Sequence, residues 1–421
     1  MEVKTKPAYQ RYPKYKDTGI KWLGEIPAHW EIEKGKWLFK KVERPIEQSA
    51  EIITCFRDGH VTLRKNRRTD GFTNAIKEHG YQGVKKGDLV IHAMDGFAGA
   101  IGVSDSNGKS SPVYSVLTPR YNHSVNQFYY AYLLRNLAHK GLILSLAKGI
   151  RERSTDFRYK DLGKLYLNLP PKPEQTRIAN FLDRKCEQID KAIARKERLI
   201  ELLKERRQII IQNAVTQGLN PNVKLKDSGV EWIGKIPEHW EVKPLKFIAF
   251  LKSGETISYE DFTEDGYPVY GGNGFRGYTT NYTNEGEHLL IGRQGALCGN
   301  INYAKGKFYA SEHAIVVYPL NNDNILWLGE SINVSDLNRL SQSAAQPGIA
   351  VNIIKNEQFP YPPLKEQYSI SRYIENQSTK ITKAINYQQQ QIQKLKEYKT
   401  VLIDHAVTGK VKVTEKSAAY G

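Results

Sequence analysis

The residues best suited to chemistry in this chain are amide and guanidinium side chains on glycine-rich stretches. Two such stretches lie in the second half of the sequence, at residues 270–278 and 342–352. Asn, Gln and Arg can each form paired hydrogen bonds with the edge of adenine or guanine in the major groove of DNA. Ordinary surface turns are the alternative for any single residue. The candidates for contacting bases are Asn273, Arg276, Arg293, Gln294, Gln346 and Asn352.

Basic residues gather in two polar stretches of the first half of the chain. Over the whole sequence, Lys plus Arg (62) exceeds Asp plus Glu (45), which gives a net charge of +17. This balance suits a polyanionic partner such as nucleic acid, although surface lysines that only keep a protein soluble would give a similar count. We expect the two clusters to bind DNA phosphates without selecting a sequence. They consist of Arg64, Lys65, Arg67 and Arg68, and of Lys148, Arg151, Arg153 and Arg158.

Motifs for covalent chemistry do not stand out. The ten histidines include no His-Glu-x-x-His pair and no His/Cys spacing typical of a metal site. No nucleophile elbow or Gly-x-Gly-x-x-Gly cofactor loop stands out either. His29 and His239 each lie between a proline and a tryptophan, and packing against Trp30 and Trp240 is a better explanation for them than catalysis. We therefore predict a noncatalytic chain that holds no metal and no cofactor of its own.

The cysteines and the hydropathy of the sequence indicate in which cellular compartment the protein is found. The three cysteines, Cys55, Cys186 and Cys298, share no short spacing and are odd in number, which argues against a disulfide framework. No stretch approaches the ~20 apolar residues that a membrane-spanning helix needs. We expect a cytoplasmic protein that is neither exported nor embedded in a membrane.

The elements that must position the candidate residues occur twice. Residues 16–31 return 210 positions later as residues 226–241, with Gly, Ile or Val, Trp, Gly, Ile, Pro, His and Trp in matching places; we call these two segments the Trp boxes. A Pro-Pro-x-x-Glu-Gln motif at 170–175 returns 192 positions later at 362–367. Repetition at a fixed period indicates two copies of one module. The interval from Trp box to Pro-Pro motif is 140 positions in the first copy and 122 in the second, so the insert between them differs.

A long helix is predicted after each Pro-Pro motif. Eight apolar residues keep a three-and-four spacing in the first copy, and all eight remain apolar 192 positions later. This pattern is typical of a long helix packed along another helix. Roughly 35 to 40 residues, ending near Gly218 and Gly409, would make a rod of ~50 to 60 Å. The two stripes are most simply buried against each other. A two-fold relation between the modules would make the helices antiparallel, but the periodicity alone leaves a parallel pairing open.

The insert between each Trp box and its Pro-Pro motif is predicted to fold as a mixed α/β globule. Residues 87–103 and 286–301 each give short apolar strands broken by glycines, and further strands are expected at 113–117 and 314–318. A helix is expected from about Asn126 to Leu137. The predicted fold class is therefore α+β: two mixed α/β domains joined by a pair of long antiparallel helices, with a pseudo-two-fold internal repeat.

This order of Trp box, variable insert, Pro-Pro-x-x-Glu-Gln motif and long helix, present twice, resembles the specificity subunit of type I restriction-modification systems. The resemblance covers essentially the whole chain. Its most specific parts are the paired Trp boxes, the Glu-Gln helix starts, and the Ala-Val-Thr helix ends at 214–216 and 406–408. Residues 86–91 and 111–117 are also similar to the target-recognition domains of that family.

The resemblance implies a division of the chain and a function. Residues 1–170 would hold the first Trp box and target-recognition domain, and 171–218 the central long helix. Residues 219–362 would hold the second box and domain, and 363–421 the C-terminal helix and tail. Each domain would recognise one half of an asymmetric, bipartite sequence in double-stranded DNA, and the helices would set the length of the spacer. The chain would direct modification subunits, which methylate adenine with S-adenosylmethionine, and a restriction subunit, which uses ATP and Mg to translocate and cut DNA.

Other functions remain open from the sequence. The chain could serve another multi-subunit modification system that lacks an ATP-driven restriction partner. A self-sufficient methyltransferase or nuclease would turn over on its own with DNA and S-adenosylmethionine or ATP. A coiled-coil scaffold would not bind DNA, and it would leave the two glycine-rich inserts unexplained.

Overall fold

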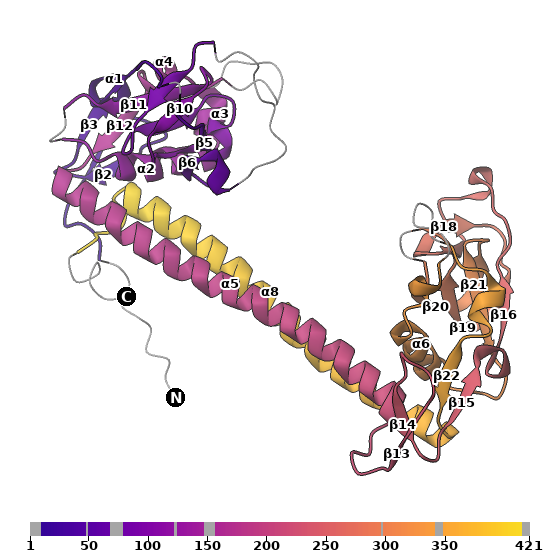
Figure 1. The fold of residues 1–421 in the computed structure, drawn as a ribbon. Coiled ribbons are helices and arrows are strands. Elements are labelled where there is room, and N and C mark those ends of the chain that lie inside the picture. Colours follow the sequence, from indigo (N-terminus) through magenta and orange to yellow (C-terminus); the bar gives the residue numbers. More distant parts are fainter. Residues whose placement is uncertain are drawn as a thin grey trace. The chain divides into compact units, whose positions relative to one another are not determined.

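The computed structural model describes residues 10–47, 49–67, 79–121, 124–146, 156–295, 298–341 and 348–414. The chain divides into two compact units. Unit 1 comprises residues 1–195 and 391–421, and unit 2 comprises residues 196–390. Each unit contains one α/β module and part of both long helices (Figure 1). No helix in the described part of the chain is both long and apolar enough to span a bilayer.

The module of unit 1 is built on an antiparallel sheet with the strand order β4-β11-β8-β9. These strands are β4 (Phe39–Lys41), β8 (Leu89–His92), β9 (Ile101–Val103) and β11 (Tyr114–Pro119). Two-stranded pairs surround the sheet: β1 (Tyr15–Asp17) with β2 (Glu25–Pro27), β3 (Glu31–Lys34) with β12 (Tyr166–Leu169), β5 (Ile53–Cys55) with β6 (Val61–Leu63), and β7 (Gln82–Val84) with β10 (Gly108–Ser110). The helices are α1 (Gly35–Leu38), α2 (Gln127–His139), α3 (Leu142–Leu146) and α4 (Tyr159–Leu162), with 3-10 turns η1 (Arg64–Asn66) and η2 (Gly96–Ala98).

The module of unit 2 carries a larger sheet with the order β16-β21-β19-β20-β17-β18. Its strands are β16 (Ala249–Ser253), β17 (Tyr267–Gly271), β18 (Gly274–Thr279), β19 (Asn284–Gly292), β20 (Ile301–Ala310) and β21 (Ala314–Pro319). The pairs β13 (Leu225–Asp227) with β14 (Lys235–Pro237) and β15 (Glu241–Pro244) with β22 (Gln358–Tyr361) repeat those of unit 1. The helices are α6 (Ile325–Val334) and α7 (Val351–Ile354), with 3-10 turns η3 (Leu245–Phe247), η4 (Tyr259–Asp261) and η5 (Leu337–Leu340).

The central sheets of the two modules have the same register. In unit 1, Leu89 pairs with Val103 and Leu117. In unit 2, the residues 200 positions later make the same pairs, Leu289 with Tyr303 and Val317. The offset is 210 for the edge strands β4 and β16, because Leu117 pairs with Lys41 and Val317 with Leu251. It is 192 for β12 and β22, as it is for the Pro-Pro motifs. The repeat recognised in the sequence is thus a repeat of strand pairing.

The two long helices are α5 (Lys172–Gln217) and α8 (Leu364–Val407), of 46 and 44 residues. Both exceed the 35 to 40 residues predicted from the apolar stripe, because their first and last turns pack into the modules. Gly218 and Gly409 follow the helix ends with φ of 74° and 75°. A glycine in this left-handed conformation is the common residue after a helix terminus.

The helices run antiparallel. In unit 1, Lys399 Nζ near the end of α8 lies 2.7 Å from Asp190 Oδ2 in the first half of α5. In unit 2, Lys196 Nζ donates to Gln388 Oε1 at 2.9 Å, so a later residue of α5 meets an earlier residue of α8. The stripe residues Ile178, Leu182, Ile189, Ile193 and Ile200 of α5, and Ile370, Ile374, Ile381, Ile392 and Leu402 of α8, are buried. The predicted fold class, with antiparallel helices, is confirmed.

The glutamine of each Pro-Pro-x-x-Glu-Gln motif ties a helix start to its module. Gln175 and Gln367 are fully buried. The Gln175 side chain accepts a hydrogen bond from the backbone N–H of Asn126 at 2.8 Å and donates one to the carbonyl of Pro170 at 2.7 Å. Gln367 makes the same two bonds in unit 2, at 2.9 and 3.1 Å, with the N-cap residue of α6 and with Pro362. Because Asn126 caps α2, the motif fixes the module helix relative to the long helix.

Each Trp box packs against the start of the long helix that follows its own module. Trp30 and Trp240 are fully buried. The rings of His29 and His239 lie edge-on to them, with centroids 6.5 and 6.4 Å apart, as the sequence predicted. The histidines also contact the glutamate of the Pro-Pro motif, His29 with Glu174 at 3.0 Å and His239 with the equivalent glutamate at 2.7 Å. The repeated residues therefore form the structural frame of each module.

Candidate nucleic-acid interface

The predicted base-contacting residues of unit 2 gather at the end of β19. A Cβ placed on Gly292 would lie only 2.1 Å from the carbonyl oxygen of Gly272, so the two backbones are in direct contact. The β17–β18 turn, which carries Asn273, therefore lies beside Arg293 and Gln294. Glycine at position 292 permits this approach, because any side chain there would force the two segments apart.

The segment after residue 348 joins the same cluster. The N–H of Ile349 donates to the carbonyl of Arg293 at 3.0 Å, and Gln294 forms an isolated β-bridge with Gly348. Asn352 follows in α7. We call Asn273, Arg276, Arg293, Gln294 and Asn352 the β19 loop cluster. Gln346, the sixth predicted residue, lies outside the described residues.

The cluster presents its polar side chains to solvent. Asn273, Arg276, Gln294 and Asn352 are exposed, and Arg293 is half-buried. The Arg276 side chain crosses Gly271, since its Cδ is 2.4 Å from the position that a Cβ on that glycine would take. The guanidinium carbon also lies 5.5 Å from the ring centroid of Phe262. Arg276 is thus held by its stem and by a cation–π contact, and its donors remain accessible.

The first predicted phosphate-binding cluster is partly neutralised. Arg64 and Lys65 form η1, and Arg67 follows it. Lys65 Nζ lies 2.6 Å from Glu51 Oε1, and Arg67 lies 2.7 Å from Asp58 and stacks on Phe56 at 4.7 Å. These ion pairs are exposed, so each contributes little and can open for another anion. Arg68 lies outside the described residues.

Little of the second cluster can be placed. Lys148, Arg151 and Arg153 lie outside the described residues. Arg158 occupies the N-cap position of α4, and its Nε donates to both carboxylate oxygens of Asp156 at 2.7 and 2.8 Å. Its side chain is exposed, so the cation remains available at the surface.

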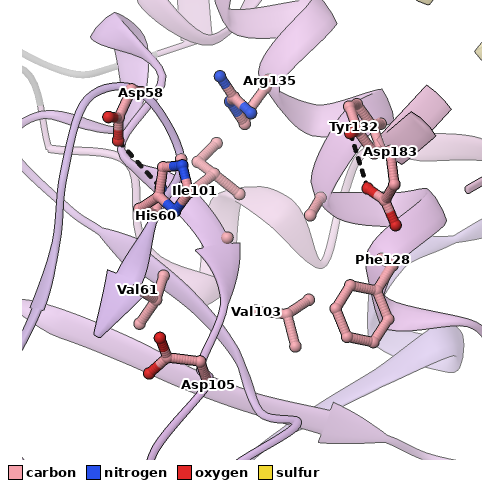
Figure 2. A pocket seen from close by; sticks show the side chains of 13 residues that line it. Asp58, His60, Val61, Ile101, Val103, Asp105, Phe128, Tyr132, Arg135 and Asp183 are labelled. Carbon is pink, nitrogen blue, oxygen red and sulfur yellow. Dashed lines mark hydrogen bonds between the residues drawn. The ribbon is translucent and has the colours of Figure 1, made fainter. Parts of the chain in front are cut away.

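A hollow of about 240 Å³ beside the first cluster has the opposite charge (Figure 2). Asp58, Asp105 and Asp183 line it, and Arg135 is the guanidinium among its lining residues. Tyr132 donates to Asp183 at 2.8 Å. Burial raises the pKa of Asp183, although this hydrogen bond acts in the opposite direction. A lining with three carboxylates disfavours a phosphate.

Sequence reasoning missed an exposed basic-aromatic pair that occurs in both modules. Trp37 is 49% exposed, with Lys36 Nζ 5.1 Å from its ring centroid and Arg120 5.9 Å away. At the positions 210 later, Phe247 is 59% exposed with Lys246 Nζ 5.4 Å from its ring. The only sequence signal was a lysine before an aromatic residue at matching positions, which does not distinguish an exposed ring from a buried one.

The class defined by this fold is a chain with two copies of an α/β module, built on sheets of equal register that carry unlike loops. The described residues contain no group of three His, Cys, Asp or Glu side chains that could hold a metal ion. Comparisons with known proteins show what the chain is similar to.

Residues 237–418 match the family described as the type I restriction modification DNA specificity domain. The specificity subunit of the type I restriction enzyme EcoprrI from Escherichia coli is 39% identical over 142 residues, which make up 32% of this chain and 35% of that protein. The match thus spans about a third of that relative. A putative type I restriction enzyme MjaX specificity subunit from Methanocaldococcus jannaschii is 23% identical over 427 residues, covering 93% of this chain and 96% of that one.

Solved structures have the same fold over most of the chain. A chain from a study of complex assembly and conformational transition of the type I R-M system has a TM-score of 0.72 at 15% identity, covering 91% of this chain and 98% of that one. The HsdS subunit from Thermoanaerobacter tengcongensis has a TM-score of 0.59 at 14% identity, covering 94% and 100%. The chain is thus similar to type I restriction-modification specificity subunits in sequence, and it shares the fold of the HsdS subunit over most of its length.

Proposed function

We propose that this chain is a noncatalytic subunit that recognises a bipartite, asymmetric sequence in double-stranded DNA. The two recognition domains would be residues 1–170 and 219–362, and the helical segments 171–218 and 363–421 would connect them. One observation carries the proposal. Two sheets of identical register present different side chains at equivalent loop positions, Ala93 and Met94 in unit 1 and Arg293 and Gln294 in unit 2.

This difference supports a target with two unlike halves. The Trp boxes and Pro-Pro motifs are repeated, whereas the two residues after β8 and β19 are not. An arginine and a glutamine can discriminate guanine and adenine by paired hydrogen bonds, while in unit 1 Ala93 is buried and Met94 offers only apolar contact. The two modules would therefore recognise different bases.

The protein partners are inferred from the proteins that this chain resembles. The relatives are specificity subunits of type I restriction enzymes, and the structural neighbour with the higher TM-score comes from work on assembly of such a system. This chain would direct modification subunits that use S-adenosylmethionine and a restriction subunit that uses ATP and Mg. Its own contribution would be positioning on DNA, through phosphate contacts and base contacts.

A selection experiment tests base recognition by the β19 loop cluster. The double variant Arg293→Ala, Gln294→Ala should lose preference in one half of the target and keep it in the other, because removing each pair of hydrogen bonds to a base weakens discrimination by ~1 to 3 kcal/mol. The measurement is sequencing of random DNA duplexes retained by the complex with its modification subunits. Lys305→Ala is the matched control, since Lys305 is exposed and pairs with Glu287 in the β19–β20 hairpin. Unchanged preference in both halves would contradict the assignment.

Salt dependence tests the phosphate contacts separately. Replacing Arg64, Lys65 and Arg67 with Ala should weaken DNA binding for all sequences alike and lower the slope of log K against log salt by ~0.9 for each phosphate that is no longer neutralised. Lys191→Ala on α5 is the control, because this lysine is exposed and paired with Glu187. An unchanged slope in the triple variant would show that this cluster does not bind the backbone of DNA.

A further inference from the structure

Tyr12 completes the frame around the first Trp box. Its side chain is buried, and its hydroxyl donates to Oε1 of Glu174 at the start of α5. The ring centroid lies 5.5 Å from that of His29 and 5.8 Å from that of Trp30. The phenol ring covers Glu174, whose side chain is only 8% exposed.

The second module has the same frame without the phenol. Residue 222, which is 210 positions after Tyr12, is an exposed asparagine. Glu366 keeps its contact with His239 at 2.7 Å, and Trp240 Nε1 donates to its second oxygen at 3.0 Å. The Glu366 side chain is 39% exposed, against 8% for its counterpart. The carboxylate that a tyrosine covers in unit 1 is thus open in unit 2.

A pocket of about 280 Å³ occupies this place in unit 2. This volume exceeds the ~150 Å³ of a cavity that accepts benzene, so an aromatic ring fits. A carboxylate oxygen can accept two hydrogen bonds, so Glu366 retains capacity for a donor in addition to His239 and Trp240. The lining combines apolar side chains with the polar Gln217, Asn220 and Ser369, and it contains His239 and Glu366, the counterparts of the histidine and glutamate that contact Tyr12 in unit 1. Among the lining residues are Leu219, Val223, Pro237, His239, Glu366 and Ile370.

We propose that this pocket binds a tyrosine side chain of a partner polypeptide, with the tyrosine hydroxyl donating to Glu366. We assign the pocket to a polypeptide other than this chain; Tyr12 itself cannot fill it, because it is buried and hydrogen-bonded within its own unit. The internal repeat supplies the template: the equivalent histidine and glutamate, His29 and Glu174, already contact a tyrosine in unit 1. The surface is separate from the β19 loop cluster, and the inference does not depend on DNA binding.

A peptide of residues 10–17 serves as the probe, because it is the segment that carries Tyr12 into the equivalent site. Binding to the full-length chain is measured by titration calorimetry, with peptides that have Tyr, Phe or Ala at position 12. We expect the Phe peptide to bind about tenfold more weakly, since a hydrogen bond to a charged group is removed. The Ala peptide should bind at least a hundredfold more weakly, since the ring is removed as well.

Variants of the chain locate the binding. In Asn222→Tyr, the new tyrosine ring of the chain itself would fill the pocket and should weaken peptide binding at least tenfold. The circular dichroism spectrum and DNA binding should stay unchanged. Lys226→Tyr is the control, since it adds a tyrosine on β13, beyond the segment 217–223 whose residues border the pocket, and it should leave peptide binding unchanged.

Three results would overturn the proposal. Equal affinity of the Tyr and Ala peptides would show that no ring is recognised. Unchanged binding to the Asn222→Tyr chain would place the peptide elsewhere. A concentration-dependent dimer of the chain in sedimentation, abolished by Tyr12→Ala, would make a second copy the occupant in place of a different partner.

Discussion

The glutamate of the Pro-Pro motif accepts hydrogen bonds from different donors in the two modules. In unit 1, Glu174 accepts the hydroxyl of Tyr12, and the buried indole nitrogen of Trp30 makes no hydrogen bond within the described residues. In unit 2, Trp240 donates to Glu366 and no tyrosine is present. Burial and the neighbouring carboxylate raise the pKa of Tyr12 far above its usual value. The repeat thus preserves the acceptor and the tryptophan, whereas the donor Tyr12, which lies outside the repeat, is present in unit 1 alone.

The largest difference between the modules should come from removing that tyrosine. Tyr12→Ala is expected to destabilise unit 1 by about 3 kcal/mol, because a buried aromatic ring and a hydrogen bond to a carboxylate are both removed. Asn222→Ala, the equivalent change in unit 2, should alter stability by less than about 0.5 kcal/mol, because the residue is exposed. Hydrogen exchange read by mass spectrometry separates the two units. Similar loss of protection in both variants would contradict the comparison.

Acid should affect the modules unequally. Asp404, near the end of α8, is 13% exposed; its burial would raise its pKa, but hydrogen bonds from Lys140, Asn136 and Lys410 outweigh this and lower it. A carboxylate with a lowered pKa in the folded state stabilises the fold above the pKa of the unfolded chain, about 4, and loses this contribution as the pH falls through the folded-state pKa. The residue 192 positions earlier, in unit 2, is Gln212, which has no charge to lose.

Replacing this carboxylate tests the pH dependence. Asp404→Asn should destabilise unit 1 by about 2 kcal/mol at pH 7, and the difference from the natural chain should shrink below about pH 4. Urea denaturation of the variant and of the natural chain at pH 7, 5 and 3 measures the difference in their free energy of unfolding. Gln212→Asn is the control in unit 2 and should give no pH-dependent difference. A gap that stays constant down to pH 3 would exclude the charge of Asp404 as the cause.

The smallest of the three effects concerns the tryptophans. Trp30→Phe and Trp240→Phe remove the same volume, but only Trp240 gives up a hydrogen bond to a carboxylate. Trp240→Phe should therefore be the more destabilising by about 1.5 kcal/mol. Urea denaturation of the two variants gives the difference. Equal midpoints would mean that the indole donor in unit 2 contributes nothing net.

The sequence predicted the frame of this molecule because the frame is repeated. The Trp boxes gave the number of modules, and the apolar stripes gave the helices and their mutual burial. The roles of Glu174 and Gln175 could not be foreseen, since their partners His29 and Asn126 are separated from them by 145 and 49 positions. Tertiary hydrogen bonds of this range leave no periodic pattern.

The candidate site could be predicted only as a set of residue types. Glycine-rich composition indicated the stretches around Asn273 and Gln294, but their proximity depends on the contact between Gly272 and Gly292. The basic cluster of unit 1 was recognised by charge alone. Its neutralisation could not be, because Glu51 and Asp58 lie on other turns and pair with it only in the folded module.

The three constant offsets have a consequence for how such a gene can change. The offset falls from 210 to 200 between β4 and β8 and from 200 to 192 between β11 and β12, and it is constant across the paired strands. One codon gained inside a strand would shift the pairing by a residue and turn buried side chains to the opposite face. Those two intervals have absorbed net differences in length while the pairing was kept. They are where insertions and deletions are tolerated, and new recognition surfaces can arise there without loss of the fold.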